Sequence, residues 1–278
     1  MTTDGANTRA LASLVRAGVL DAELAALAWL TFEAGIPLVV AGEPDTGRAA
    51  VRDALLDLVP AGTRTVTLGG EAETFAWMAE AVELGWRHDG PWTGKAEAAQ
   101  AAGRLSARTG DAQSVLVADL EDEPSGGTWG ERARLAIRAL ALGYGLAATA
   151  RGSRLEDVLG RLAAPPVSAI DDELTRLGVV LVLGDEGGVS RVAAAHYLRP
   201  VARDANGHVQ RLAPAVLATW NLSAGRFDHF AWGVVGELAG RTGRRPVQLE
   251  REQAVRAREL ASVAAAPPAS IPPASSMG

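Results

Sequence analysis

Apolar residues recur along the first part of the chain at spacings that distinguish helices from buried strands. Residues 9–34 carry apolar side chains at helical spacing in two stretches, the first ending at Gly18 and the second capped by Asp21. The run 36–41 (IPLVVA) is short, apolar and β-branched, as in a strand buried on both faces of a parallel sheet. The pattern predicts a pair of helices followed by a central strand.

The same alternation of strand and helix continues to residue 162. Further strands are expected at 65–68, 114–120 and 145–150. The helices expected between and after these strands cover 51–59, 73–82, 96–107, 129–142 and 154–162. A surface loop is expected at 88–95. Alternating strands and helices are typical of βαβ units, so we predict a mainly parallel sheet flanked by helices on both faces.

The pattern changes after Pro165-Pro166. Two runs at 179–183 and 192–198 flank a glycine pair and predict a hairpin, with further strands at 209–212 and 216–220. A helix is expected at 227–238. The predicted fold class is therefore α/β, with a mainly parallel sheet and an antiparallel C-terminal hairpin. The aromatic residues near the end of the domain are expected to pack under that closing helix: Trp220, Phe227, Phe230 and Trp232.

Three segments follow from these patterns. Residues 1–8 are expected to be a flexible N-terminus, and residues 9–240 to form one domain. Residues 241–278 are expected to hold an exposed charged helix at about 246–260 and a disordered tail rich in Pro, Ala and Ser, which offers no face for packing.

Composition excludes several kinds of chemistry. The chain of 278 residues has no cysteine, which excludes disulfides, zinc-thiolate sites and thiol catalysis. Its net charge of -6 argues against nucleic acid as a partner, and no nucleic-acid motif is visible. The four histidines are scattered, so no metal site is expected. No run reaches the length of a membrane span, and a cytoplasmic protein without direct membrane insertion is expected.

Residues 42–49 (GEPDTGRA) directly follow the first predicted strand and resemble a phosphate-binding loop. The pattern G-x-x-x-x-G-K-[S/T] keeps both glycines here, but Arg48 replaces the lysine and Ala49 replaces the hydroxyl residue. Arginine can contact phosphates, whereas alanine cannot hold Mg²⁺. The candidate ATP-binding residues are Gly42, Asp45, Thr46, Gly47, Arg48 and Ala49.

The segment from residue 14 to residue 68 resembles the ATPase domain of the type II and type IV secretion and pilus-assembly ATPases. In that family a helix ending in "LWLAVEAG" leads to a strand, the phosphate loop, a second helix and the segment "IPPGERIVTIED". Two later segments are similar to the family in the same order, namely VLVADLEDE at 115–123 and GLAATARGSRLEDVLGRL at 145–162. The likeness covers about residues 11–222 and does not include the family's separate N-terminal domain. It implies a RecA-like P-loop fold.

The resemblance assigns catalytic positions, and most of them are altered. Asp119 falls where the family has the glutamate of its second nucleotide-binding strand, and Glu121 falls where it has an arginine. We take these two as the candidate catalytic residues. The family's acidic pair is replaced by Gly69-Gly70, and its histidine is replaced by Ala150.

These departures predict a catalytically impaired homologue, a pseudo-ATPase that binds ATP weakly or not at all and lacks a loop ligand for Mg²⁺. Its expected role is structural or regulatory, in a homo- or hetero-oligomer with secretion or pilus-type components. The alternative is an active motor ATPase that uses Arg48 for the phosphates and Asp119 or Glu121 for Mg²⁺ and water. A third reading is a loop recruited to bind another anion.

Overall fold

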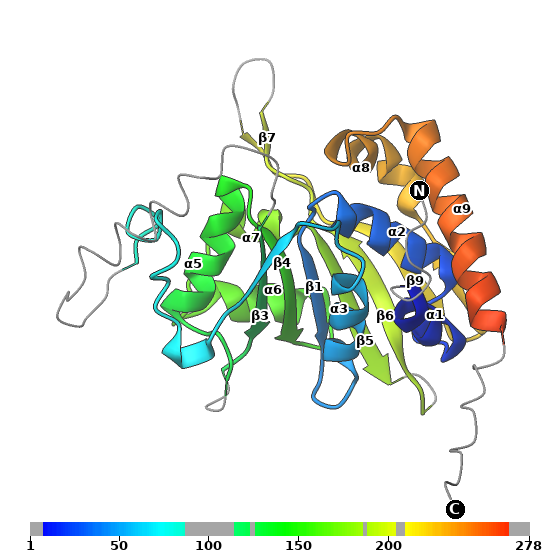
Figure 1. Cartoon of the computed structure of the whole chain (residues 1–278), viewed down its shortest axis with the longest axis horizontal. Helices are drawn as coiled ribbons and strands as arrows, with labels where there is room; N and C mark the ends of the chain where they lie inside the picture. The colour runs from blue at the N-terminus through cyan, green and yellow to red at the C-terminus, as the bar shows by residue number, and fades with distance from the viewer. Residues whose placement is uncertain (1–7, 87–113, 123–125, 186–187, 204–208, 267–278) are drawn as a thin grey trace, which may run out of the picture.

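The computed structural model describes residues 8–86, 114–122, 126–185, 188–203 and 209–266 (Figure 1). The expected loop at 88–95, the helix at 96–107 and the tail from 267 lie outside these residues, as do residues 1–7. The elements described form three layers, with one sheet between two groups of helices.

The central layer is an eight-stranded sheet in the order β10-β9-β6-β5-β1-β4-β3-β2. Five strands are parallel to one another: β1 (Leu38–Gly42), β2 (Arg64–Thr67), β3 (Ser114–Leu120), β4 (Gly145–Arg151) and β5 (Val179–Asp185). Three antiparallel strands extend the sheet beyond β5: β6 (Ser190–Tyr197), β9 (Ala215–Asn221) and β10 (Arg226–His229). Strands β7 (Ala202–Arg203) and β8 (Val209–Gln210) form a separate short ribbon. The predicted α/β class, mainly parallel with an antiparallel C-terminal part, is confirmed.

Helices cover both faces of the sheet (Figure 1). One face carries α1 (Thr8–Arg16), α2 (Ala22–Glu33), α3 (Arg48–Leu56), α8 (Val235–Arg241) and α9 (Pro246–Ala265). The other face carries α5 (Glu131–Ala139), α6 (Leu155–Ala163) and α7 (Asp171–Leu174). Alternate residues of the central strands point into the two layers. In β1, for example, Leu38 and Val40 pack with the first group, and Val39 and Ala41 with the second.

The predicted helix at 73–82 is wrong. A short 3₁₀ helix at Gly70–Ala72 is followed by hydrogen-bonded turns instead. The buried carboxylate of Glu73 accepts hydrogen bonds from the backbone N–H groups of Gly69 and Phe75, at 3.1 and 2.6 Å, and from the indole N–H of Trp77 at 3.2 Å. This side chain satisfies backbone donors locally and so competes with helix formation. Phe75 takes a positive φ of 52°, which interrupts any helix there.

The predicted closing helix at 227–238 begins as a strand. Residues 226–229 form β10 on the sheet edge, and a 3₁₀ turn, η4 (Ala231–Val234), leads to α8. Phe227 is buried against Trp220, with ring centroids 5.1 Å apart, as expected. In contrast, Phe230 is 40% exposed and Trp232 is 76% exposed, so the expectation that all four aromatic residues pack inward is wrong for these two.

Helix α9 lies against α1 and α2, unlike the exposed helix predicted for this segment (Figure 1). Leu249 and Leu260 are buried in the same cluster as the residues of α2. Arg256 stacks over the ring of Trp29 at 4.1 Å and pairs with the carboxylate of Glu33. The apolar residues of the segment are spaced to meet a partner surface, and that surface is formed by helices more than 200 residues earlier in the chain.

A histidine on the edge strand is tied to the start of α2. Asp21 caps α2 by accepting from the N–H of Leu24 at 2.9 Å, and its other carboxylate oxygen lies 2.8 Å from Nε2 of His229. This hydrogen bond is the main cause that raises the pKa of His229, opposed by burial and aided by Glu23 and Asp228. The protonated imidazole is therefore favoured in the folded protein.

We expect this pair to make stability depend on pH. Because the pKa of His229 is higher in the folded than in the unfolded protein, protonation of this histidine stabilises the fold. The full contribution is present below the unfolded-state pKa of about 6.5, and it is lost as the pH rises through the folded-state pKa. Urea unfolding of the wild type and His229→Gln from about pH 5.5 to pH 8.5 tests it. The difference between the two proteins should shrink as pH rises. A difference that stays constant with pH contradicts the prediction. His196 serves as the contrast, because burial lowers its pKa and gives it the opposite slope.

Candidate functional site

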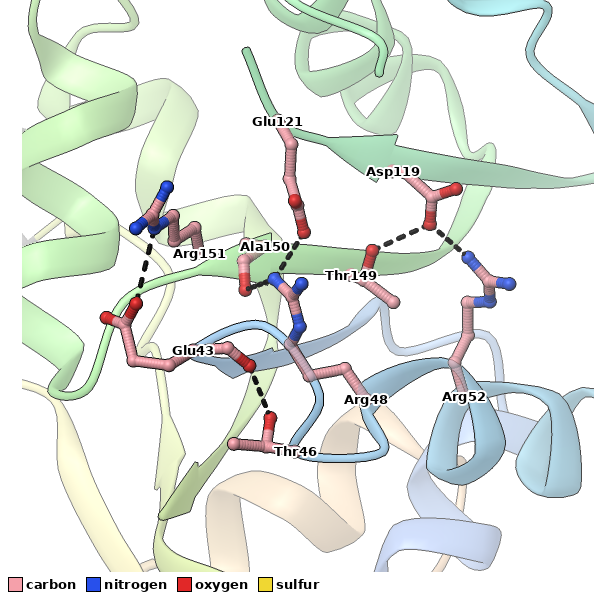
Figure 2. Close-up of polar contacts among 9 residues, drawn as sticks. All are labelled: Glu43, Thr46, Arg48, Arg52, Asp119, Glu121, Thr149, Ala150 and Arg151. Atoms are coloured by element: carbon pink, nitrogen blue, oxygen red, sulfur yellow. Dashed lines mark hydrogen bonds and ion pairs between the residues drawn. The ribbon is translucent and has the colours of Figure 1, made fainter. Parts of the chain in front are cut away.

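The candidate site lies at the carboxyl ends of the parallel strands. Residues 43–47 connect the end of β1 to the start of α3, and β4 and β3 end beside this loop (Figure 2). The central position of β1, between β4 and β5, brings together side chains that are far apart in sequence. In open α/β sheets this edge is the usual location of ligand sites.

The loop has the tight backbone expected from its two glycines. Gly47 adopts φ 79° and caps α3, and Asp45 also takes a positive φ of 65°. At Gly42 any side chain would meet its neighbours, because an added Cβ would lie 2.5 Å from Oγ1 of Thr46 and 3.2 Å from Leu183. The first glycine is thus required by close packing and the second by a left-handed backbone conformation.

Thr46 uses its hydroxyl within the loop. Its Oγ1 donates to the backbone carbonyl of Glu43 at 2.7 Å, and the Glu43 carboxylate lies 3.2 Å from Nε of Arg151 (Figure 2). These contacts brace the loop against β4. Ala49 lies exposed in the first turn of α3 and offers only a methyl group. The loop therefore presents no side-chain hydroxyl at the position where a phosphate-binding loop places its Mg²⁺ ligand.

Arg48 points across the site to the end of β3. Its Nη1 forms an ion pair with the carboxylate of Glu121 and donates to the backbone carbonyl of Ala150 at 2.9 Å (Figure 2). The side chains of Arg48 and Glu121 are only 13% and 9% exposed, so the pair is largely removed from water. The guanidinium of Arg48 is thus held by an internal carboxylate and a backbone carbonyl.

Asp119 is occupied by a second arginine. The hydroxyl of Thr149 donates to Oδ1 of Asp119 at 2.6 Å, and Arg52 pairs with the same oxygen (Figure 2). Arg52 also binds Asp53 at 2.8 Å. Burial lowers the pKa of Arg52, but its contacts with Asp53 and Asp119 outweigh burial and raise it overall, so this guanidinium is fully charged. Both candidate catalytic carboxylates are therefore engaged by arginines of α3.

A pocket with a volume of about 410 Å³ opens between the loop and the strand ends. Its lining includes three carboxylates, on Asp45, Asp119 and Glu121, and one arginine, Arg48. Backbone N–H groups at the start of α3 face this region and favour an anion. The side-chain charges oppose them, because acids outnumber the cation on the pocket wall. The pocket lies where open α/β sheets bind ligands, and the charge on its wall is mainly negative.

The resemblance places further catalytic groups at Ala150 and at Gly69-Gly70, and Ala150 and Gly70 lie in tightly packed surroundings. The side chain of Ala150 is buried among the residues of the α5 and α6 layer, and only its carbonyl reaches the site. Gly70 takes a φ of 58°, and a Cβ added there would lie 2.5 Å from the carbonyl oxygen of Gly126. Gly126 in turn lines the pocket. A side chain at 70 would therefore collide with backbone, and the side chain at 150 lies in the packed layer.

The structure thus gathers the predicted residues and adds two that sequence reasoning missed. The loop residues 42–49, Asp119 and Glu121 all lie around one pocket or its loop. Arg52 was missed although it follows Arg48 by four residues and shares its helix face. Thr149 was missed because the family resemblance assigns the functional histidine to the next position, 150. Successive side chains of a strand point to opposite faces, so residues 149 and 150 cannot both face the site. That alternation turns Thr149 toward the site and Ala150 away from it.

The described residues hold neither a candidate metal cluster nor a candidate membrane-spanning helix. Across the ranges that the structure describes, no three His, Asp or Glu side chains gather where they could bind a metal ion. Within the same ranges, no helix combines the length and the apolar character needed to cross a membrane.

Comparisons with known proteins do not show a family for this chain. No family model matches the chain, and no curated protein matches it. One matching solved structure is the crystal structure of the VirB11 ATPase from the Brucella suis type IV secretion system in complex with sulphate. That protein is 20% identical, with a TM-score of 0.39, over 60% of this chain, and the match spans half of its own length. A likeness at this TM-score does not assign the chain to a family.

Proposed function

We propose that this protein is a non-catalytic relative of the secretion and pilus-assembly ATPases, in which the nucleotide site is closed by its own side chains. The observation that carries the proposal is the buried pair between Arg48 and Glu121. Nη1 of Arg48 contacts both Glu121 and the carbonyl of Ala150, so it must give up these contacts to bind a phosphate. Leaving a buried carboxylate without its partner is unfavourable, so the internal pair competes directly with nucleotide.

The charge on the pocket wall supports the same conclusion. A nucleoside triphosphate brings several negative charges toward Asp45, Asp119 and Glu121. In an active P-loop enzyme Mg²⁺ offsets part of such repulsion, and a loop hydroxyl holds the ion. Ala49 cannot supply that ligand. Each missing group of this kind lowers turnover by orders of magnitude, and here the losses fall within one site.

The role that remains for such a chain is structural or regulatory. The resemblance of residues 11–222 to the secretion ATPases supports a place beside secretion or pilus-type components, as a subunit in a homo- or hetero-oligomer. The alternative of an active motor is favoured by one observation, namely that Asp119 and Glu121 keep carboxylates at the pocket. In that reading Mg²⁺ displaces Arg48 and Arg52 from these carboxylates.

Titration with a fluorescent ATP analogue, with and without Mg²⁺, tests the proposal. We expect no saturable binding by the wild type at millimolar nucleotide, and we expect Glu121→Gln to gain binding because a neutral amide no longer holds Arg48 as an ion pair. Arg48→Ala in the Glu121→Gln background is the control and should lose the gained binding. Wild-type binding that strengthens with Mg²⁺ and disappears in Arg48→Ala would favour the motor.

A further inference from the structure

An apolar groove lies on the side of the molecule formed by the C-terminal helices. It has a volume of about 490 Å³ and is bounded by α2, by η4 with α8, and by α9. Apolar side chains make up most of its wall, chiefly Leu27, Ala231, Trp232, Val235, Leu249 and Ala257. The groove is also lined by four ionisable side chains, the acids Glu23 and Glu250 and the bases His229 and Arg258. Its location is distinct from the pocket at the strand ends.

The exposure of Trp232 indicates that this groove binds a partner. Its side chain is 76% exposed, although tryptophan normally buries most of its large apolar surface. Trp232 also lines a second hollow together with Val216 and Phe230, which are 38% and 40% exposed. Exposed aromatic and aliphatic surface gathered in one place marks an interaction site.

The end of α9 fixes where the following chain begins. Arg16 of α1 donates to the carbonyl oxygens of Val263, Ala264 and Ala266 at 3.0, 2.6 and 2.8 Å. These contacts close the C-terminus of the helix and hold Ala266 in an extended conformation, with φ −67° and ψ 140°. Ala266 therefore has the extended backbone that a residue before proline favours.

The sequence from 267 has the chemistry that suits an aromatic groove. Residues 267–278 read PPASIPPASSMG and contain two proline pairs, Ile271 and no charged side chain. Proline pairs favour the polyproline II conformation, which is extended and needs little ordering on binding. Segments of this kind bind grooves lined by aromatic side chains. The absence of charge also suits a groove whose wall is mainly apolar.

The segment is long enough to reach the groove. From Ala265 back to Ala254, which lines the groove, α9 rises about 16 Å. Six residues in polyproline II conformation span about 19 Å. A chain that turns back along α9 after Ala266 thus brings Ile271 to Pro273 level with Ala254, Ala257 and Trp232.

We propose that residues 267–273 fold back along α9 and bind in this groove of the same chain, covering Trp232. Tethering at Ala266 keeps the local concentration of the segment high, so a contact of modest intrinsic affinity is well populated. A second copy of the chain and a separate protein are the competing occupants, and the experiment separates them from the tail of the same molecule.

The chain has no cysteine, so Ala274→Cys gives one site for a nitroxide spin label on the full-length protein. Trp232 is observed by fluorine NMR after 5-fluorotryptophan incorporation, and Trp232→Phe identifies its resonance among the seven tryptophans. We expect the label to broaden the Trp232 signal, and reduction of the nitroxide to restore it. Ile271→Asp should abolish the broadening, because a charge does not fit the apolar wall. Ser276→Asp adds the same charge beyond the docked residues and should preserve it.

A mixed sample distinguishes the occupants. It combines spin-labelled chains without fluorine and fluorinated chains without the label. Broadening that appears in the doubly labelled chain and is absent from the mixture supports docking within one molecule. Equal broadening in both samples would assign the groove to a second copy and overturn the proposal. A Trp232 signal that stays sharp in both samples, or broadening unchanged by Ile271→Asp, would also overturn it.

Discussion

Arg48→Ala is expected to lower the free energy of unfolding by about 3 kcal/mol, although the residue lies at a helix start near the surface. The replacement leaves the carboxylate of Glu121, 9% exposed, without its cation. A buried charge that loses its partner keeps its desolvation penalty and gains nothing in return. Chemical denaturation of the wild type and the variant at neutral pH measures the difference.

Two further variants make this prediction specific. Glu121→Gln in the Arg48→Ala background should recover most of the lost stability, because the buried charge is then removed as well. Arg52→Ala is the matched control from the same helix. Its partner Asp119 is 53% exposed and becomes hydrated when unpaired, so a loss of only about 1 kcal/mol is expected. Equal losses in the two arginine variants would show that burial of Glu121 does not determine the effect.

Gly70→Ala is expected to destabilise the protein by about 3 kcal/mol, which combines left-handed strain with overpacking. Gly70 has a φ of 58°, and the added methyl would approach the carbonyl oxygen of Gly126 to 2.5 Å. The obstacle is backbone, which cannot rotate away as a flexible side chain does. Thermal and urea unfolding of the variant measure the loss.

The neighbouring glycine supplies a matched control. Gly69 has a φ of −81°, and the nearest atom to an added Cβ is 3.7 Å away. Gly69→Ala should therefore change stability by less than about 0.5 kcal/mol. If both variants are equally stable, the close approach of residues 70 and 126 is not a constraint. The same geometry predicts that placing an acidic pair at 69–70, as the secretion ATPases have, costs stability.

Prediction from sequence succeeded where a segment's own pattern controls its conformation. The run 114–120 is apolar and β-branched, and it forms β3 with those bounds because a strand buried on both faces needs only that character. Asp21 was identified as a cap, and it caps α2 by accepting from Leu24. The parallel order of the first four strands followed from the alternation with helices, because parallel strands need crossover connections.

Prediction failed where a distant or unusual contact prevails over local periodicity. Residues 73–82 have helical spacing, but the carboxylate of Glu73 binds the donors of Gly69, Phe75 and Trp77 and holds a different backbone. Residues 226–229 join the sheet because β9 offers them an edge. Helix α9 finds its partner surface on α1 and α2, which no local pattern specifies.

The sequence by itself determined the α/β class, the position of the glycine-containing loop 42–47 between β1 and α3, and the presence of an arginine and an alanine at 48 and 49. These depend on residue type and short-range spacing. Only the tertiary structure decided that Arg48 is bound to Glu121, 73 residues away, and Arg52 to Asp119. Such pairs arise where the strand order places β3 and β4 beside β1, and burial then sets their energies.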